Sequence, residues 1–342
     1  MSIKNAILSA AIIGLLACNQ KEMMVTAVTS WVTHPDKSVL FQLQPEIQFQ
    51  ESPTQGPTIN VDTAQQFQTV DGFGFSLTGG SAQLINSLPG AKQDSLLREL
   101  FSTNGIGVSF LRISIGASDL DDHVFSYNDL PAGAKDPKLE KFSLLEDQKN
   151  LIPILKKIVA IYPEIKIMGS PWSAPPWMKT NGGTKGGKLK EEFYPVYAQF
   201  FVKYLKALQQ EGINLHSITI QNEPENPNNN PSMVMTADEQ SVFIRDHLGP
   251  AFAQAGIATK IVLFDHNCDH PEYPISILGD TITRKFVDGS AFHMYLGDIT
   301  AMSKTHDAHP DKNLYFSEQW TSGDGEFGGD LGWHVNTLIV GA

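Results

Sequence analysis

The sequence SITIQNEP at residues 217–224 runs from an apolar, β-branched segment directly into a polar end. Residues of this kind favour a buried strand, and Pro224 ends it because proline has no backbone N–H to donate to a sheet. The strand therefore places Asn222 and Glu223 at its carboxyl end. Taken alone, Glu223 is either a reactive carboxylic acid or a solvent-exposed strand-end glutamate, and this segment leaves both open.

Six further β-rich segments alternate with helical patterns along the chain. Apolar residues recur at helical spacing between the strands, and this alternation predicts a parallel sheet covered by helices. We expect strands at Gly72–Ser76, Val108–Ile115, Lys166–Trp172, Ser217–Asn222, Lys260–Asp265, Ser290–Tyr295 and Asn313–Glu318, and helices at Ala91–Phe101, Glu146–Tyr162, Tyr194–Glu211 and Thr236–Ala255.

Polar and aromatic side chains stand at the ends of most of these predicted strands. In a (β/α)8 TIM barrel the carboxyl ends of all strands converge on one mouth, whereas a doubly wound sheet would not gather residues from so many strands. Residues 72–77 also lack the G-x-G-x-x-G pattern of a dinucleotide-binding loop. We therefore predict an α/β fold of the TIM-barrel class, with these residues at its mouth: Arg112, Trp172, Asn222, Glu223, Asp265, His266, His293, Tyr295 and Glu318.

Seven strands are counted, and the sequence printed here ends just after an apolar run, Val335–Val340, that could form a helix. Since a closed barrel needs a last strand to cover its edges, the eighth strand is expected to be missing and the barrel incomplete at the C-terminus. We expect a signal peptide at 1–18, a tether with a β element at 19–70, and the barrel at 71–342. The β element is expected from Val39–Gln50 and Ile59–Val70.

The composition argues against one class of partner. The 342 residues include 37 acidic and 25 basic side chains, a net charge of −12, and no run of basic residues. Clustered lysine and arginine are needed to bind a phosphate backbone, so no nucleic-acid partner is expected.

The first eighteen residues have the pattern of an export signal. Lys4 supplies positive charge, and the apolar run Ala6–Leu16 is too short to span a bilayer. The sequence LLAC at residues 15–18 resembles a bacterial lipoprotein signal, in which Cys18 becomes the lipidated first residue; the alternative is an ordinary secretory signal with a chance cysteine. We expect export to the bacterial cell envelope (periplasm or cell surface), with membrane contact only through a lipid anchor.

A second carboxylate follows an apolar strand in the sequence NLYFSEQW at residues 313–320. It places Glu318 at the carboxyl end of the seventh predicted strand. Enzymes that hydrolyse glycosides with retention of configuration hold two carboxyl groups about 5–5.5 Å apart, one as acid and one as nucleophile. Glu223 and Glu318 on two strands of one barrel can reach that spacing, and together they favour catalysis over chance.

A metal-dependent hydrolase is a third possibility besides a glycosidase and a binding protein. Asp265, His266, Asp269 and His270 offer metal-ligating groups, although they can equally line the end of the fifth strand. Cys268 has no second cysteine near it at metal-ligand spacing and is expected to be a small core residue. No metal and no cofactor is predicted.

Beyond the two glutamates, several motifs resemble glycoside hydrolase family 30, which includes glucosylceramidases and β-1,6-glucanases. The resemblance runs from about residue 72 to the end. It implies a TIM barrel together with a β-sandwich, of which only a partial N-terminal element is expected here. The matching motifs are DGFG at 71–74, FLRIS at 110–114 followed by Asp119, SPWSAPPWMK at 170–179, NEP at 222–224, H-x-Y at 293–295 and SE at 317–318.

The resemblance implies roles for four charged residues. Glu223 matches the acid/base of the family and Glu318 its nucleophile. Asp119 resembles the aspartate that binds hydroxyls of the terminal sugar, or else it caps a helix. Arg112 is expected to pair with a catalytic carboxylate and to keep Glu318 ionised, a role compatible with a structural buried ion pair.

Five further residues are expected on the substrate side of the mouth. Asn222 can bind a sugar hydroxyl, and Trp172 can stack under a pyranose ring, with Trp320 near the same pocket. Tyr295 can bind and steady Glu318. His293 can reach a sugar hydroxyl, although a core histidine is the usual alternative.

The resemblance implies a β-linked glucoside as substrate. The loops at 225–231 and 321–326 are polar, which favours an oligosaccharide or β-glucan over a membrane glycolipid. The predicted activity is retaining hydrolysis by two glutamates. The alternative is a non-catalytic carbohydrate-binding lipoprotein, because the family's eighth strand and the C-terminal part of its sandwich are not recognised in this sequence.

Overall fold

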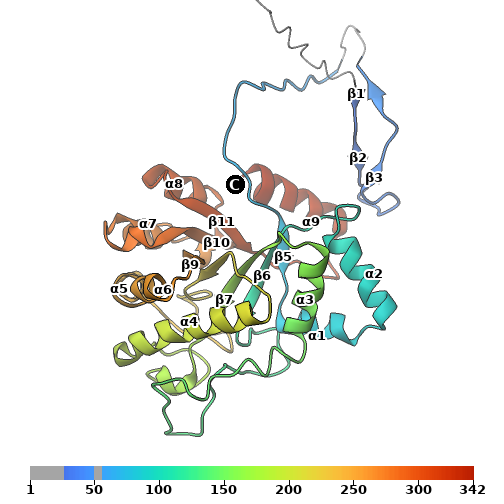
Figure 1. Ribbon diagram of the computed structural model, residues 1–342. Coiled ribbons are helices and arrows are strands. Elements are labelled where there is room, and N and C mark those ends of the chain that lie inside the picture. The colour runs from blue at the N-terminus through green and yellow to red at the C-terminus, as the bar shows by residue number, and fades with distance from the viewer. Residues whose placement is uncertain (1–26, 50–55) are drawn as a thin grey trace, which may run out of the picture. The chain divides into compact units, whose positions relative to one another are not determined.

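The computed structural model describes residues 27–49 and 56–342 (Figure 1). The chain divides into two compact units, Met1–Gln66 with Glu326–Gly329, and Phe67–Gly325 with Asp330–Ala342. The predicted signal peptide and Cys18 lie outside the described residues. Among the described residues, no helix combines the length and the apolar character needed to cross a membrane.

The first unit contains four strands of two residues each. They pair as two antiparallel ladders, β1 with β4 and β2 with β3, and no sandwich is formed by the described residues. Of the two segments expected to form the β element, Val39–Gln50 contains two short strands, and Ile59–Val70 contains none. Side chains such as Ile59 and Val61 stay exposed, so little apolar burial supports longer strands. The strands are β1 Ala27–Val28, β2 Trp31–Val32, β3 Gln42–Leu43 and β4 Ile47–Gln48.

The second unit is built on one sheet of seven parallel strands, in the order β11-β10-β9-β8-β7-β6-β5. Every strand lies beside its neighbour along the chain, as a barrel requires, and all seven predicted strands are confirmed. Among the described residues no strand joins β5 to β11. The strands are β5 Gly74–Ser76, β6 Phe110–Ile115, β7 Lys166–Pro171, β8 Ser217–Thr219, β9 Lys260–Cys268, β10 Val287–Gly297 and β11 Asn313–Glu318.

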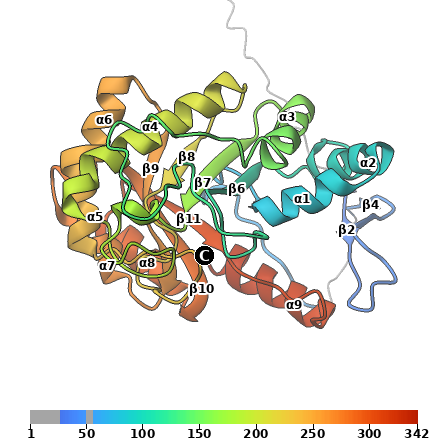
Figure 2. The same ribbon diagram turned by 90° about the horizontal axis from the view of Figure 1, so that it is seen from below.

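Helices cover the outer face of this sheet, as Figure 2 shows. The predicted capping box is present: Thr236 accepts the N–H of Glu239 at 3.3 Å, and the Glu239 carboxylate accepts the N–H of Thr236 at 2.8 Å. The helix that follows is α5, a π-helical segment Ile244–Leu248 and α6. The helices are α1 Gly79–Ser87, α2 Gly90–Phe101, α3 Leu151–Ile161, α4 Tyr194–Gln210, α5 Ala237–Phe243, α6 Gly249–Ala255, α7 Glu272–Gly279, α8 Thr300–Ala308 and α9 Phe327–Trp333.

The core has two parts. The larger lies between helices and sheet, where α4 buries the predicted face of Tyr197, Phe201 and Tyr204. The smaller lies inside the curved sheet and consists of single residues from separate strands, Met168, Val262, Ala291 and Tyr315, with Phe110 packed against them. This apolar layer lies on the inside of the sheet, beneath the strand ends.

Candidate active site

A polar layer lies directly above the apolar one, because side chains two residues apart on a strand point to the same face. Phe110 is followed by Arg112, Met168 by Ser170, Ala291 by His293 and Tyr315 by Ser317. On β9 the alternation predicts that Phe264 follows Val262 inward. The structure places Asp265 there instead.

A β-bulge causes this exchange. Phe264 pairs with Ala291 and His266 with Phe292, so Asp265 has no partner in the ladder. Phe264 and Asp265 both have left-handed backbone angles, φ 68° and 64°. The bulge turns Phe264 outward, where its ring packs near Tyr273 of α7, with ring centroids 5.0 Å apart.

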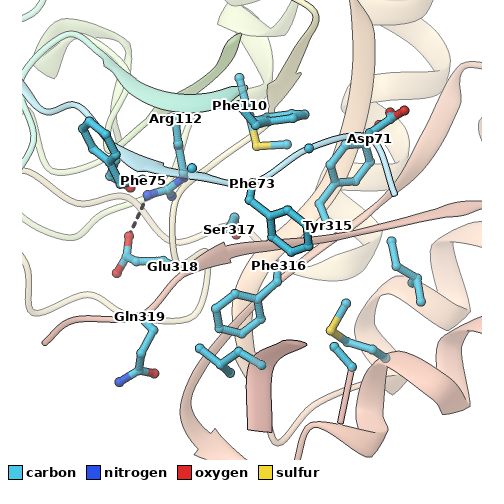
Figure 3. Close-up of a pocket in the computed structure, with 18 of the residues that line it drawn as sticks. Asp71, Phe73, Phe75, Phe110, Arg112, Tyr315, Phe316, Ser317, Glu318 and Gln319 are labelled. Carbon is cyan, nitrogen blue, oxygen red and sulfur yellow. Dashed lines mark hydrogen bonds and ion pairs between the residues drawn. The ribbon is translucent and has the colours of Figure 1, made fainter. Parts of the chain in front are cut away.

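Arg112 is the most connected side chain of the polar layer. Its Nη1 donates to Oε2 of Glu318 at 2.7 Å, as Figure 3 shows. Its Nη2 donates to Asp265 at 2.9 Å and to Oδ1 of Asn222 at 2.6 Å, and its Nε donates to Ser170 at 3.1 Å. Burial lowers the pKa of Arg112, but the charges of Asp265 and Glu318 outweigh it and raise the pKa. One cation thus binds two carboxylates.

Asp265 is fully buried and accepts four hydrogen bonds. Besides Arg112, its donors are Thr219 at 2.7 Å, Ser317 at 2.6 Å and Nε2 of His293 at 3.0 Å. Burial raises the pKa of this carboxyl, but Arg112 and His293 together hold it well below its usual range. Asp265 is therefore a permanent anion under the site.

His293 is also fully buried, beneath the two glutamates rather than on the open side of the pocket. Its Nδ1 lies 3.7 Å from Oε1 of Glu223 and 3.7 Å from Oε1 of Glu318. Burial lowers the pKa of this imidazole, but Glu318, Asp265 and Glu223 raise it to about 9. The expected contact with a sugar hydroxyl is replaced by contacts with three carboxylates, and His293 is a cation at neutral pH.

Glu223 has a left-handed backbone, φ 46°, which is uncommon for a residue with a Cβ, and residues in such strained conformations cluster at active sites. Its N–H donates to the carbonyl of Asp265 at 2.9 Å, which ties it to the bulge. Its Oε2 accepts from Asn226 at 2.8 Å and from Asn229 at 2.7 Å. Burial raises the pKa of Glu223, but His293 and Asn226 offset this and lower it overall.

The two glutamates lie close together. One carboxylate oxygen of Glu223, one of Glu318 and a ring nitrogen of His293 all lie within 4.8 Å of one another. Tyr295 donates its hydroxyl to Oε1 of Glu318 at 3.1 Å. Arg112 and Tyr295 therefore hold one oxygen each of the Glu318 carboxylate.

The candidate metal ligands are not brought together as one site. Asp265 is bound by Arg112, whereas Asp269 and His270 are exposed, and His270 pairs with Glu225 at 2.8 Å. In residues 27–49 and 56–342, the one trio with ligand atoms within 4.8 Å is Glu223, His293 and Glu318. The imidazole of this trio donates from Nε2 to Asp265 at 3.0 Å.

A pocket of about 2030 Å³ contains both glutamates and extends along the inside of the sheet past Met168 and Tyr315. Trp172 is almost fully buried in its wall, with the Arg112 guanidinium 4.9 Å from the ring centroid, whereas Trp320 is largely exposed. Asp119 lies at the exposed rim; partial desolvation and the charges of Glu318 and Glu223 raise its pKa. The residues that line the pocket include Asp119, Trp172, Glu223, Tyr295, Glu318 and Trp320.

Asn222 does not line this pocket. It is buried, and its Oδ1 accepts from Arg112, so that oxygen supports the polar layer and is not offered to a sugar.

Sequence reasoning gave no role in this site to five residues. Asp265 was placed at the mouth, but its contact with Arg112 was not predicted, because strand alternation points Phe264 inward. The loop asparagines had a visible signal, since they follow Glu223 at a distance of three and six residues in a polar loop. The five residues are Ser170, Thr219, Asn226, Asn229 and Ser317.

The parallel strands bring two glutamates to one mouth, where an arginine binds one of these glutamates. This arrangement defines a TIM-barrel domain of the glycoside hydrolase type. The chain belongs to glycoside hydrolase family 30: the family profile, described as the glycosyl hydrolase family 30 TIM-barrel domain, matches residues 70–331.

Relatives within the family differ in their named substrates. The chain is 37% identical to an endo-1,6-β-D-glucanase of Neurospora crassa over 78% of this chain and 56% of the relative. It is 32% identical to the lysosomal acid glucosylceramidase of Mus musculus over 77% of this chain and 54% of the relative. The chain thus spans little more than half the length of these relatives.

A solved endo-β1,6-glucanase has a similar structure. The two superpose with a TM-score of 0.84 at 32% sequence identity, over 92% of this chain and 71% of that one.

Proposed function

We propose that this protein is a retaining β-glycoside hydrolase acting on a β-1,6-linked glucan. The observation that supports it most is the approach of Glu223 and Glu318 to within 4.8 Å. Retaining enzymes hold their carboxyl groups about 5–5.5 Å apart, whereas inverting enzymes need about 6.5–9.5 Å to admit a water.

The charges around the site support the assignment of the two roles. Arg112 and His293 are cations, and Asp265 is an anion. One further negative charge balances the cluster, and Glu318 supplies it because Arg112 contacts it directly. Glu223 has no arginine partner among the described residues, and it can hold a proton without leaving an unbalanced buried charge.

The mechanism has two displacement steps. In the first, Glu318 attacks the anomeric carbon while the proton of Glu223 passes to the glycosidic oxygen, which leaves with the bond electrons. In the second, Glu223 takes a proton from water, the water oxygen attacks the anomeric carbon, and Glu318 leaves as carboxylate. The two inversions together retain the β configuration.

The acid role needs a protonated Glu223 in the substrate complex. Its pKa in the open site lies below the usual value because His293 and Asn226 favour the anion. A saccharide that fills the pocket excludes water from this carboxyl, and desolvation raises the pKa of a carboxylic acid. Substrate binding and protonation of Glu223 therefore support one another.

A glucan is favoured over a glycolipid on two grounds. The endo-1,6-β-glucanases of Neurospora crassa and Aspergillus fumigatus are 37% and 33% identical to this chain. The loop after β8, residues 225–231, is also polar and lines the pocket through Asn226 and Asn229, and such side chains suit a saccharide better than a lipid chain.

Hydrolysis of β-1,6-glucan and of an aryl β-glucoside by the full chain tests the proposal. Glu318→Gln should abolish turnover, and Glu192→Gln, which changes an exposed glutamate, should leave it intact. A 2-deoxy-2-fluoroglucoside should label Glu318, as seen by peptide mass spectrometry. Product of inverted configuration would exclude the mechanism. Binding of glucan without hydrolysis would favour the carbohydrate-binding alternative, and turnover confined to glucosylceramide would exclude the glucan.

A further inference from the structure

The two oxygens of Glu223 have different surroundings. Oε2 accepts the side-chain N–H groups of Asn226 and Asn229, at 2.8 and 2.7 Å. Oε1 lies toward Nδ1 of His293, at 3.7 Å, and the same nitrogen lies 3.7 Å from Oε1 of Glu318. Oε1 therefore faces the other glutamate, and Oε2 faces the loop.

The orientation of the Asn226 amide is fixed by a second contact. Its Oδ1 accepts the backbone N–H of Asn228 at 2.9 Å. With the oxygen engaged there, the amide nitrogen points to Glu223 and can only donate.

The loop that contains both asparagines is held by a fully buried lysine. Nζ of Lys179 donates to the carbonyls of Ser232 at 2.7 Å and Thr184 at 3.0 Å. The hydroxyl of Ser232 donates to the carbonyl of Pro227 at 3.1 Å, and that of Thr184 donates to Asn230 at 2.8 Å. These contacts fix the loop at several points between Pro227 and Ser232, so the asparagines have a defined position.

We infer that Asn226 and Asn229 are positioning residues that keep the acid's proton on Oε1 of Glu223, directed at the gap between the two glutamates. An oxygen that already accepts two N–H groups cannot take the proton without losing part of that bonding. The proton therefore resides on Oε1, the oxygen nearer Glu318. This inference rests on the proposed function of Glu223 as the acid.

The same contacts set the acidity of Glu223. N–H donors favour the charged form of a carboxyl and lower its pKa. After the proton has left, the two amides stabilise the carboxylate that must then act as base. Loss of one donor is expected to raise the pKa of Glu223 and to let its proton move to Oε2.

Substrates with different leaving groups separate positioning from a structural role. Asn229→Leu removes one donor at similar size, and Asn226→Asp keeps the acceptor for Asn228 but removes the other donor. Asn228→Ala is the matched control, because its side chain is exposed in the same loop. Both donor variants should lose about tenfold or more in kcat/KM on phenyl β-glucoside, where the acid is needed. They should lose little on dinitrophenyl β-glucoside, whose leaving group departs without a proton.

The basic limb of the kcat/KM profile should also move to higher pH in the donor variants, because it reports the acid in the free enzyme. A structural defect would lower kcat/KM equally for both substrates and leave the basic limb of the profile at the same pH. Equal losses, or behaviour like that of Asn228→Ala, would overturn the inference.

A titration that does not depend on turnover completes the test. Carboxyl NMR of protein labelled with ¹³C-glutamate, with the signal assigned by Glu223→Gln, should show a higher pKa of Glu223 in Asn229→Leu than in the parent. If the parent hydrolyses neither glucoside, the proposed function fails, and this titration alone decides the positioning: a raised pKa supports it and an unchanged one overturns it.

Discussion

Asp265 is the residue around which the polar layer is arranged. It is fully buried and binds Arg112, Thr219, Ser317 and His293. Arg112 in turn binds Glu318, and Nδ1 of His293 lies 3.7 Å from Oε1 of Glu318. A change at Asp265 therefore acts on both proposed catalytic carboxylates without touching either.

Asp265→Asn is expected to destabilise the protein by about 3–5 kcal/mol, because it removes one partner of a buried ion pair and leaves Arg112 undercompensated. Urea unfolding at neutral pH measures this. The matched control is Asp311→Asn, which breaks an exposed aspartate–arginine pair with Arg284 and should have a much smaller effect. Equal losses of unfolding free energy in both variants would show that the buried ion pair contributes no more to stability than the exposed one.

His293 predicts a pH dependence of stability. Its folded pKa of about 9 lies above the ordinary 6.5, so the folded state binds its proton more tightly. The stabilisation is fully present below pH 6.5 and is lost as the pH rises through about 9. The difference in unfolding free energy between the parent and His293→Gln should therefore shrink across this window in urea titrations. A difference that stays constant or grows would contradict the raised pKa.

The sequence predicted that the proposed site lies at the strand ends, but it did not predict the contacts among its side chains. Arg112, Tyr295 and both glutamates converge where the carboxyl ends of parallel strands meet. Asn222 and His293 turn out to be buried, where Asn222 accepts from Arg112 and His293 faces carboxylates. Burial at a strand end depends on neighbouring strands, and no local pattern reports it.

At the scale of elements, the bulge in β9 is held by a helix. Gln240 of α5 is fully buried, and its Oε1 accepts the N–H of Phe264 at 3.0 Å. The left-handed pair Phe264–Asp265 takes this N–H out of the ladder, so the glutamine replaces the missing strand partner. Helix α5 thereby helps to place Asp265.

Gln240→Leu should cost about 1–3 kcal/mol, because it leaves the buried N–H of Phe264 without an acceptor. It should also lower kcat/KM by displacing Asp265 from Arg112. Gln209→Leu, at an exposed position of α4, provides the comparison. Urea unfolding and glucoside hydrolysis report the two effects, and a Gln240→Leu variant as stable and active as the Gln209→Leu variant would show that the bulge does not need this contact.

The strands of the large sheet and the long helices were predictable, and the short helices were not. All seven strands of the large sheet and the apolar face of α4 follow from composition and periodicity. Helices α1, α7 and α8, of eight or nine residues each, were not predicted. The bulge was invisible because a single extra residue changes which side chain faces inward without changing the strand's composition.

At the scale of the whole molecule, each strand lies beside its neighbour in the chain, so residues far apart in sequence meet at one mouth. Arg112 and Glu318 are separated by 206 positions, yet their side chains lie 2.7 Å apart. The apolar layer of Met168, Val262, Ala291 and Tyr315 lies beneath them on the same face of the sheet. Three strands and the bulged β9 thus supply both layers, so the polar side chains meet only when the whole sheet is formed.

A lipid anchor at Cys18 would place this site at a membrane surface, and we propose this location from the sequence LLAC at residues 15–18. In bacterial cells the parent should incorporate labelled palmitate and enter the detergent phase of a Triton X-114 extract. Cys18→Ser should do neither, because acyl chains bound through this cysteine would provide the attachment. Cys268→Ser, which changes a buried cysteine of β9, should behave as the parent does. A parent protein found only in the aqueous phase without label would instead indicate an ordinary secretory signal.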